Sequence, residues 1–377
     1  MMPFTRRDFT RLGAAGVASQ LFPAFPRLLH AEGAAPAEGD KKIGYAIIGL
    51  GRIADHFMRG IQQTSNSKVT GLVSGHPDKA ARIAEKYGVP KDSIYNYQNM
   101  DEMKNNPLID AVYVALPKGM HAEYTIRSAK AGKHVLCEKP MCSTVSEAEA
   151  MIAACNEAKV KLMIAYRCHY ETTNLRAVKL IRDGAIGKMQ QINSVFGFRQ
   201  TLGEWRLDKA LAGGGPMMDV GIYCLNATRY LTGEEPAEIS AYTYTDKSDP
   251  LFQKGVEANI GWVTKFPSGV VAACNTTYAS QMEGYFHVYG SKGWLHVEPA
   301  FSYEKLRLNG VIATEQNPHQ NLDEANPEKD PHQFANEADH FSDCVLNNKT
   351  PKTPGEEGLQ DLKLIRQIYH SVGIDMA

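Results

Sequence analysis

The chain has 377 residues, a length at which one small core is not expected and two domains are the default. Hydrophobic residues make up 43% and charged residues 22% of it, as in ordinary globular proteins. The net charge of -1 argues against nucleic-acid and membrane-surface partners. The seven cysteines contain no C-x-x-C pair, so we expect neither a disulfide framework nor a metal site.

The N-terminus has the pattern of an export signal. Thr5–Arg11 (TRRDFTR) contains twin arginines and is followed by the mildly apolar Leu12–Phe25 and by small residues around Ala31. This order is typical of a twin-arginine signal peptide. We therefore predict a signal in residues 1–31, an arm in residues 32–41, passage through the twin-arginine export machinery and a periplasmic protein. A basic, disordered tail is the alternative.

Ile43–Ala54 predicts a buried strand that runs into a dinucleotide-binding turn of the form G-x-G-x-x-A. Gly49 permits the tight turn, Gly51 permits close approach to a pyrophosphate, and Ala54 permits the helix to pack on the strand. The free N–H groups that begin the following helix, about Arg52–Gln63, favour phosphate. A purely structural glycine turn is the alternative. The predicted cofactor contacts here are Gly49, Leu50, Gly51, Arg52, Ile53 and Ala54.

Strand and helix patterns alternate over residues 42–166, which predicts a Rossmann domain with a parallel sheet. The further predicted strands are Val69–Ser74, Ile94–Tyr97, Asp110–Leu116, His134–Cys137 and Lys161–Tyr166. The predicted helices are Pro77–Tyr87, His121–Ala131 and Val145–Ala158.

The end of the second predicted strand favours NADP over NAD. Enzymes that use NAD usually carry a carboxylate there to hold the ribose. Here a hydroxyl, Ser74, and a cation, Lys79, stand in that region, and both favour the 2′-phosphate of NADP. Asp78 keeps NAD as the less favoured choice, and a solvated lysine at a helix start is the structural alternative.

Cys137-Glu138-Lys139-Pro140 follows the fifth predicted strand, at the sheet edge where doubly wound folds bind ligands. Pro140 ends the strand and directs Lys139 into the cleft, where an ammonium can bind a substrate hydroxyl and stabilise an oxyanion. A surface lysine is the alternative. Without a paired base, Cys137 and Cys142 are expected to be packing residues, and His121 borders the cleft as a helix-start residue.

Gly213–Tyr223 combines a glycine loop with a helix on which Asp219 and Tyr223, four residues apart, share one face. Oxidation of a sugar hydroxyl requires a base, and a neighbouring ammonium lowers the pKa of a tyrosine. We predict that Lys139 is this ammonium, that Tyr223 is the acid/base and that Asp219 holds a sugar hydroxyl. An ordinary helix face with a buried tyrosine is the alternative.

Residues 167–377 are predicted to form an α+β domain with a large, mostly antiparallel sheet. Only one face of this sheet is expected to be covered, so the open face is predicted to form a homodimer or homotetramer. Asn317–Asp330 reads as a surface loop. The predicted strands are Ala237–Thr245, Val256–Phe266, Val270–Tyr278, Tyr285–Tyr289, Trp294–Val297 and Lys305–Leu308, and the predicted helices are Met218–Leu231, Asp330–Leu346 and Glu356–Val372.

From Lys41 to the end the chain resembles the Gfo/Idh/MocA oxidoreductase superfamily, and within it the glucose–fructose oxidoreductase branch. The segments that carry the resemblance are Gly49–Ala54, Val73–Lys79, Ala131–Pro140, Gly213–Tyr223 and Pro354–Asp361. Most of the superfamily has histidine where Tyr223 stands. Tyr223, Tyr166–Tyr170, Trp205–Leu207 and Thr228–Pro236 are similar to the branch itself.

The resemblance implies an exported enzyme that holds NADP tightly, oxidises one aldose to a lactone and reduces a second carbonyl sugar. It implies catalysis by Lys139 and Tyr223 and a substrate pocket with Arg167, Trp205 and Asp219. The implied cofactor contacts beyond the fingerprint are Ser74, Gly75, Lys79, Leu116, Pro117, His121, Glu138, Lys139 and Arg167.

Several departures from the branch leave alternatives open. The branch uses an N-terminal arm to cover the cofactor, and the arm before Lys41 is short. The second hypothesis is therefore a conventional NADP-dependent sugar dehydrogenase with exchangeable cofactor. A non-catalytic sugar or dinucleotide sensor is the third. Phe196–Glu204, Ser248–Val256 and Thr276–Gly284 depart from the branch pattern, and such loops are expected to shape the pocket.

Overall fold

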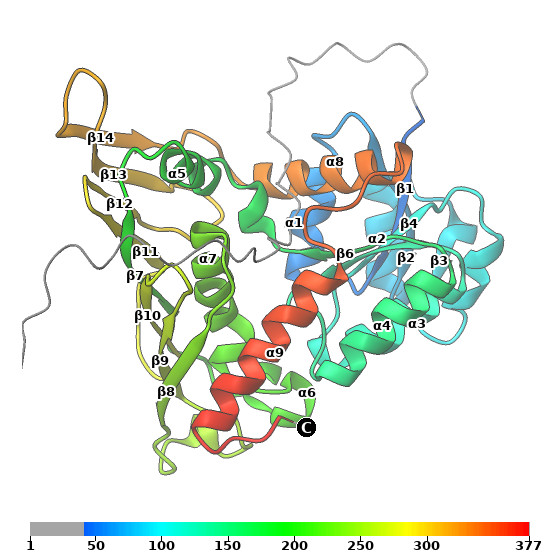
Figure 1. Cartoon of the computed structure of the whole chain (residues 1–377). Helices are drawn as coiled ribbons and strands as arrows, with labels where there is room; N and C mark the ends of the chain where they lie inside the picture. Colours follow the sequence, from blue (N-terminus) through cyan, green and yellow to red (C-terminus); the bar gives the residue numbers. More distant parts are fainter. Residues whose placement is uncertain (1–40, 377) are drawn as a thin grey trace, which may run out of the picture. The chain divides into compact units, whose positions relative to one another are not determined.

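The computed structural model describes residues 41–376, so the predicted export signal and nearly all of the predicted arm lie outside the described residues. The first domain contains a six-stranded parallel sheet in the order β3-β2-β1-β4-β5-β6 (Figure 1). The strands are β1 (Ile43–Ile48), β2 (Ser67–Val73), β3 (Ile94–Tyr95), β4 (Ala111–Val114), β5 (His134–Glu138) and β6 (Leu162–Ala165). The strand order reverses between β1 and β4, which places a ligand-binding crevice at their carboxyl ends.

Helices bury both faces of this sheet, so β1 is buried at every position. Its helices are α1 (Arg52–Ile61), α2 (Pro77–Tyr87), α3 (His121–Lys130) and α4 (Val145–Glu157). Two helices from the end of the chain, α8 (His332–Leu346) and α9 (Gly355–Ser371), pack against α1 and α4 respectively.

The second sheet has eight strands in the order β14-β13-β12-β11-β7-β10-β9-β8. Only β7 and β10 pair in parallel; all the other pairs are antiparallel. These strands are β7 (Met189–Gly197), β8 (Glu238–Tyr244), β9 (Asn259–Lys265), β10 (Val271–Thr277), β11 (Tyr285–Gly290), β12 (Trp294–Val297), β13 (Arg307–Ile312) and β14 (Gln320–Ala325). The predicted α/β fold with a second, mostly antiparallel sheet is confirmed.

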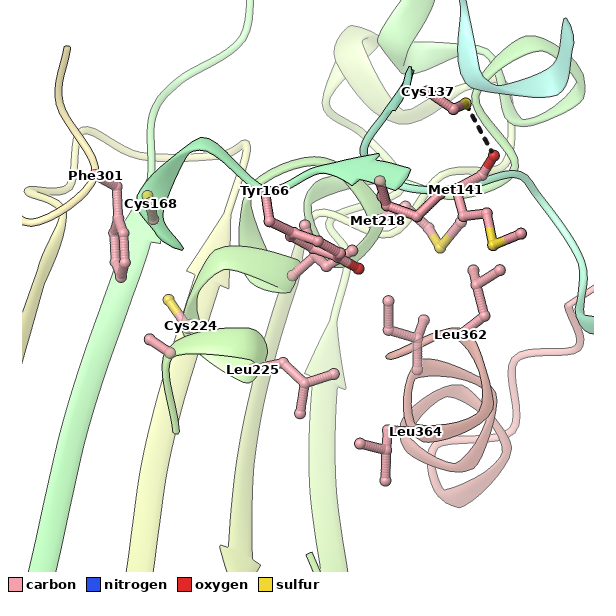
Figure 2. Packing of buried hydrophobic residues seen from close by; sticks show 14 of the residues in the cluster. Cys137, Met141, Tyr166, Cys168, Met218, Cys224, Leu225, Phe301, Leu362 and Leu364 are labelled. Carbon is pink, nitrogen blue, oxygen red and sulfur yellow. Dashed lines mark hydrogen bonds between the residues drawn. The ribbon is translucent and has the colours of Figure 1, made fainter. Parts of the chain in front are cut away.

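One face of the second sheet is covered by α5 (Thr172–Arg182) and α7 (Ile222–Thr232), as Figure 1 shows. A single hydrophobic core runs from the first sheet through α9 and α7 to the second sheet. Figure 2 shows part of this core, where Met141 after β5 lies near Met218 and near Leu362 of α9. The short helix α6 (Lys209–Ala212) and a π-helix, Met217–Gly221, precede α7.

Several elements differ from the predictions. Strand β7 and the helices α5 and α6 were not predicted. Strand β7 carries polar side chains on both faces and buries few apolar ones, so its pattern is weak. Strand β14 lies within Asn317–Asp330, so the prediction of a loop without strand structure was wrong there. Because β14 is an edge strand that pairs only with β13, its polar sequence still permits a ladder.

We expect Gly358→Ala to destabilise the protein. A Cβ at this position of α9 would lie 2.9 Å from Ile164 Cγ1 and from Met141 Cβ, in the core that joins α9 to β6. Overpacking of this kind costs about 1–3 kcal/mol, which exceeds the gain of up to about 1 kcal/mol from removing a helical glycine.

The control is Gln367→Ala, which adds alanine to an exposed position of the same helix. It should change the free energy of unfolding by no more than about 0.5 kcal/mol. Denaturant unfolding of both variants tests the packing, and equal stability of the two would contradict it.

Candidate active site

A cavity of about 700 Å³ lies at the carboxyl end of the first sheet, between that sheet and the second domain. Its walls come from the loops after β1, β4, β5 and β6 and from the segments around β7, the π-helix and β12. Ten residues predicted for the site border it: Arg52, Ile53, Leu116, His121, Glu138, Lys139, Arg167, Trp205, Asp219 and Tyr223. The two sequence regions predicted for catalysis therefore meet in one place.

The predicted dinucleotide turn has the space that the cofactor requires. Gly49 has φ +89°, and a Cβ there would lie 2.7 Å from the carbonyl oxygen of Ala115. A Cβ on Gly51 would meet nothing within 4 Å, and no side chain caps the N-terminus of α1. A helix start with open space and free N–H groups fits the pyrophosphate of a dinucleotide.

A second cavity of about 370 Å³ adjoins this turn and is bordered by Leu50, Gly51, Arg52 and Lys79. Arg52 and Lys79 bring positive charge to it, as a 2′-phosphate would require. Ser74 borders neither cavity, and its Oγ accepts a hydrogen bond from the His76 N–H at 3.1 Å. Four other predicted residues also border neither cavity: Gly49, Ala54, Gly75 and Pro117.

Lys139 joins the two domains at the centre of the larger cavity. Its Nζ donates to the backbone oxygen of Asp219 at 2.7 Å and lies 3.4 Å from that carboxylate's Oδ1. The same Nζ lies 4.6 Å from the ring centre of Tyr223. Behind it, Glu138 accepts a hydrogen bond from the Tyr113 hydroxyl at 2.5 Å, and burial raises the pKa of Glu138.

The Asp219 carboxylate is held by several protein donors. Its Oδ2 accepts from Arg206 Nε at 3.0 Å and from the Tyr278 hydroxyl. Burial alone would raise the pKa of Asp219, but Lys139, Arg206 and the nearby Lys118 hold it well below its usual range. Asp219 is therefore an anion that fixes the surrounding cations.

Asp219 and Tyr223 both border the cavity and both lie near Lys139, as a common face requires. The helix type differs from the prediction, because Asp219 lies in the π-helix Met217–Gly221 and Tyr223 lies in α7. Asp219 also contacts Arg206, whereas the Tyr223 hydroxyl contacts Arg167.

The glycine loop before the π-helix is held by a buried carboxylate. Glu257 accepts hydrogen bonds from the N–H groups of Gly215 and Met217 and from the Tyr369 hydroxyl. A Cβ on Gly215 would lie 2.5 Å from the carbonyl oxygen of Glu257. This close approach explains the need for glycine at position 215.

The Tyr223 hydroxyl accepts a hydrogen bond from Arg167 Nε at 3.1 Å. Burial raises the pKa of Tyr223, and the Arg167 guanidinium only partly opposes this effect. The lowering of this pKa predicted from Lys139 is outweighed by burial, and the Lys139 ammonium lies 4.6 Å from the ring centre, whereas Arg167 donates to the hydroxyl. Arg167 is the cation that stabilises the phenolate.

Arg167 is held firmly, since three of its four remaining N–H groups donate to protein acceptors. One terminal nitrogen donates to Gln333 Oε1 at 2.7 Å and to the backbone oxygen of Ser302 at 3.2 Å. The other donates to the backbone oxygen of Phe301 at 2.6 Å. The side chain is nearly inaccessible to solvent, so its position relative to Tyr223 is fixed by the protein.

Sequence reasoning missed Lys118, Arg206 and Tyr278. Lys118 borders the cavity although it is buried, and burial lowers its pKa to about 8 against the opposing charge of Asp219. Two features of the sequence could have indicated them: Lys118 lies two residues after Leu116, and Arg206 directly follows Trp205. Phe196–Glu204 was expected to shape the pocket, and six of its residues border the cavity; Gly284 also borders it, and no residue of Ser248–Val256 does.

His121 has a structural position at the start of α3. Its two ring nitrogens lie 2.8 Å from the backbone oxygen of Leu116 and 2.9 Å from that of Pro140, so it braces the turn that carries Lys139. Burial lowers the pKa of His121 to about 4. Cys137 and Cys142 are also buried, and burial raises the pKa of both thiols, as expected of packing residues.

Two further results concern residues 41–376 alone. These residues contain no group of three or more histidine, cysteine or acidic side chains placed to hold a metal ion. None of their helices combines the length and the apolar character that a membrane span requires.

Comparison with known proteins identifies the family. Residues 43–166 match the oxidoreductase family with an NAD-binding Rossmann fold, and residues 174–296 match the GFO/IDH/MocA C-terminal domain. The crystal structure of aldose-aldose oxidoreductase from Caulobacter crescentus, complexed with glycerol, is 42% identical, with a TM-score of 0.83 over 88% of this chain and 98% of that chain.

Curated relatives agree with this result. D-xylose 1-dehydrogenase [NADP(+)] from Haloarcula marismortui is 29% identical over 88% of this chain and 91% of that protein. 1,5-Anhydro-D-fructose reductase from Ensifer adhaerens is 26% identical over 84% of this chain and 92% of that protein. The resemblance seen in the sequence is confirmed, and the chain belongs to the GFO/IDH/MocA oxidoreductase family.

Proposed function

We propose that this protein is an NADP-dependent sugar oxidoreductase that oxidises an aldose at its anomeric carbon to a lactone. We further propose that it reduces a second carbonyl sugar with the same tightly bound cofactor. The observation that carries the proposal is the meeting of Lys139, Arg167 and Tyr223 in one cavity that also reaches the dinucleotide turn.

The similarity to aldose-aldose oxidoreductase favours a second aldose as the acceptor in place of fructose. The cavity offers both kinds of surface that bind sugars. Aromatic rings of Phe196, Trp205 and Tyr303 give apolar area for the C–H faces, and Gln200 and Thr201 give hydrogen-bonding groups for hydroxyls.

The cofactor fits the residues at the first sheet's edge. Gly51 and the start of α1 would hold the pyrophosphate, and Arg52 and Lys79 would hold the 2′-phosphate. A bound nicotinamide would supply the hydride chemistry, as acceptor for the anomeric carbon of one sugar and as donor for the carbonyl carbon of the next.

Tyr223 handles the proton. In its phenolate form, which Arg167 favours against the effect of burial, Tyr223 takes the proton of the anomeric hydroxyl as the C–H bond breaks, and this leaves the lactone carbonyl. In the second half-reaction the phenol returns that proton to the oxygen of the sugar carbonyl, which becomes an alcohol. Lys139 stabilises the negative charge on the reacting oxygen in both directions.

The similarity to D-xylose 1-dehydrogenase [NADP(+)] favours a second candidate function, a conventional aldose dehydrogenase that exchanges NADP after each turnover. Both candidates use the same chemistry at Lys139 and Tyr223 and differ in cofactor release. Retention suits a periplasmic enzyme, which we propose from the twin-arginine pattern in residues 1–31, because that compartment supplies no free NADP.

We also propose a homo-oligomer formed through the open face of the second sheet. Tyr242 and Tyr244 of β8 are 84% and 70% exposed, and Val263 of β9 is 45% exposed. Ser240 pairs directly with Val263, so Val263 and the two tyrosines lie on the same face. An apolar face of this kind on a large sheet favours contact with a second copy.

Purified, exhaustively dialysed protein should release about one equivalent of NADP when denatured. With no added nucleotide, it should convert glucose and xylose into lactone and alditol in equal total amounts, because the retained cofactor must be reduced and reoxidised in every cycle. Nicotinamide absorbance and product analysis measure both results. Empty protein that oxidises glucose only when NADP is supplied would establish the conventional dehydrogenase instead.

Tyr223→Phe and Lys139→Met should each lower kcat for sugar oxidation about a hundredfold or more, since each removes a group that acts in the transition state. Binding of NADP should change little. Lys130→Met, at an exposed position at the end of α3, is the control and should retain full activity. Unchanged turnover of every sugar by Lys139→Met would contradict this mechanism.

Val263→Glu should weaken the oligomer, because it buries a charge in the proposed contact. Sedimentation of the wild type and the variant measures the change, with Lys130→Met again as the control. A wild type that sediments as a monomer at every concentration would disprove the proposed oligomer and would leave the proposed activity unaffected.

A further inference from the structure

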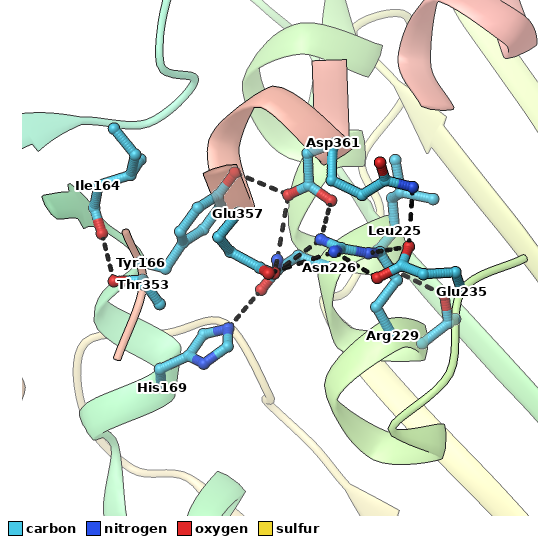
Figure 3. Close-up of polar contacts among 12 residues, drawn as sticks. Ile164, Tyr166, His169, Leu225, Asn226, Arg229, Glu235, Thr353, Glu357 and Asp361 are labelled. Atoms are coloured by element: carbon cyan, nitrogen blue, oxygen red, sulfur yellow. Dashed lines mark hydrogen bonds and ion pairs between the residues drawn. The ribbon is translucent and has the colours of Figure 1, made fainter. Parts of the chain in front are cut away.

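An ion cluster outside the cavity (Figure 3) consists of the buried Arg229 and Asp361 and the more exposed Glu235 and Glu357. Arg229 Nη1 lies 2.7 Å from Asp361 Oδ1 and from Glu357 Oε1, and its Nη2 lies 2.7 Å from Glu235 Oε1. The Asp361 side chain is 0% exposed. None of these residues borders the cavity.

The second oxygen of Asp361 joins the two segments that carry the catalytic pair. It accepts hydrogen bonds from the Tyr166 hydroxyl at 2.7 Å and from Asn226 Nδ2 at 3.0 Å. Tyr166 directly precedes Arg167, and Asn226 lies one turn after Tyr223 in α7. One carboxylate on α9 therefore connects the side chain of Tyr166, the residue before Arg167, to the helix that carries Tyr223.

A second connection runs beside the first. His169 lies in the short 3₁₀ helix Arg167–Tyr170, and its Nε2 lies 2.7 Å from Asn226 Oδ1. Asn226 is thus held on one side by Asp361 and on the other by the turn that carries Arg167. Figure 3 shows these links converging on Asn226. Both links join the segment of Arg167 to the helix of Tyr223, which the hydrogen bond from Arg167 Nε to the Tyr223 hydroxyl also joins.

Stability alone does not account for this cluster. Burying charges costs several kcal/mol each in desolvation, and apolar residues of similar volume often serve a core as well or better. A buried cluster that instead fixes the distance between two reacting groups has a use that apolar packing cannot supply, because hydrogen bonds are directional.

We propose that Asp361 is a positioning residue that holds Arg167 against the hydroxyl of Tyr223 and so sets the proton affinity of the acid/base. This inference rests on the proposed function. It assigns the C-terminal helix a part in catalysis although Asp361 touches neither cavity.

The consequence for pH follows from the surroundings of Tyr223. Arg167 is the charge that opposes the effect of burial on the pKa of Tyr223, so displacement of Arg167 should raise that pKa further. The other titratable groups facing Tyr223 are Glu138 at the end of β5, Lys139 directly after it, Cys168 beside Arg167, and Tyr303 after β12. A substitution at position 361 alters none of these directly.

The test compares Asp361→Asn with Glu235→Gln. Asparagine keeps the shape of Asp361 but presents an amide donor to Arg229 or Asn226, and Arg229 keeps Glu357 and Glu235 as partners. Glu235 is 51% exposed and binds Arg229 and Gln360 without touching Tyr166 or Asn226. Glu235→Gln therefore disturbs the cluster without breaking the link to the catalytic pair.

In Asp361→Asn we expect kcat for sugar oxidation to fall about tenfold, equivalent to about 1.4 kcal/mol in the barrier. Its pH profile should move to higher pH by about one unit, with KM and NADP affinity little changed. Glu235→Gln should lower stability without moving the profile. An unshifted profile in Asp361→Asn, or equal shifts in both variants, would overturn the proposal.

A spectroscopic measurement keeps this test independent of the proposed function. The protein is labelled with 3-fluorotyrosine, and the ¹⁹F resonance of position 223 is assigned by its loss in Tyr223→Phe. Asp361→Asn should shift this resonance and Glu235→Gln should not, because the hydroxyl contact with Arg167 changes only in the first. An unmoved resonance disproves the positioning role, whatever sugars the enzyme accepts.

Discussion

The contact on which the rest of the site depends is that of Lys139 with Asp219. The ammonium belongs to the first domain and its two acceptors, a backbone oxygen and a carboxylate, belong to the second. Because a partly buried ammonium must be compensated, this contact fixes the π-helix against the end of β5. It thereby brings Tyr223, four residues later, under the same ammonium. The cavity exists because these two parts of the chain, the end of β5 and the π-helix, meet here.

Positive charge prevails around this contact. Asp219 is held by Lys139 and Arg206, and Lys118 adds a third cation nearby. Glu138, the residue before Lys139, is buried, and burial raises its pKa. A reaction in which a hydroxyl loses its proton creates negative charge at the substrate oxygen, and this excess of cations favours it.

The first sheet and its cofactor turn were predictable because buried parallel strands are continuous apolar runs and each is punctuated by a glycine or proline turn. The second domain was less predictable. Strand β7 lies at the centre of its sheet, yet its sequence alternates too weakly to be found, since neighbouring strands satisfy its backbone whatever its side chains. Strand β14 was also not found, because it is a polar edge strand whose sequence has no apolar alternation.

At the site, spacing identified Lys139, Asp219 and Tyr223 but not their relations. The four-residue spacing placed Asp219 and Tyr223 on the same side of the cavity, but it did not reveal that Asp219 lies in a π-helix. The partner of the Tyr223 hydroxyl, Arg167, is 56 positions away in sequence, so its effect on the pKa depends on a tertiary contact that local pattern does not contain. Residue types that suit a reaction are visible in a sequence, whereas the pairing that tunes them belongs to the fold.

That distinction also explains why the C-terminal helix matters to a site it does not reach. Helix α9 packs its leucines into the core shared by both domains and places Asp361 where Tyr166 and Asn226 converge. Apolar packing leaves the helix the small movements that side-chain rotamers allow. A carboxylate that accepts from three donors, as Asp361 does, also fixes the orientation of the groups that it binds. The geometry at Tyr223 is therefore determined by the last helix of the chain as much as by the loops that line the cavity.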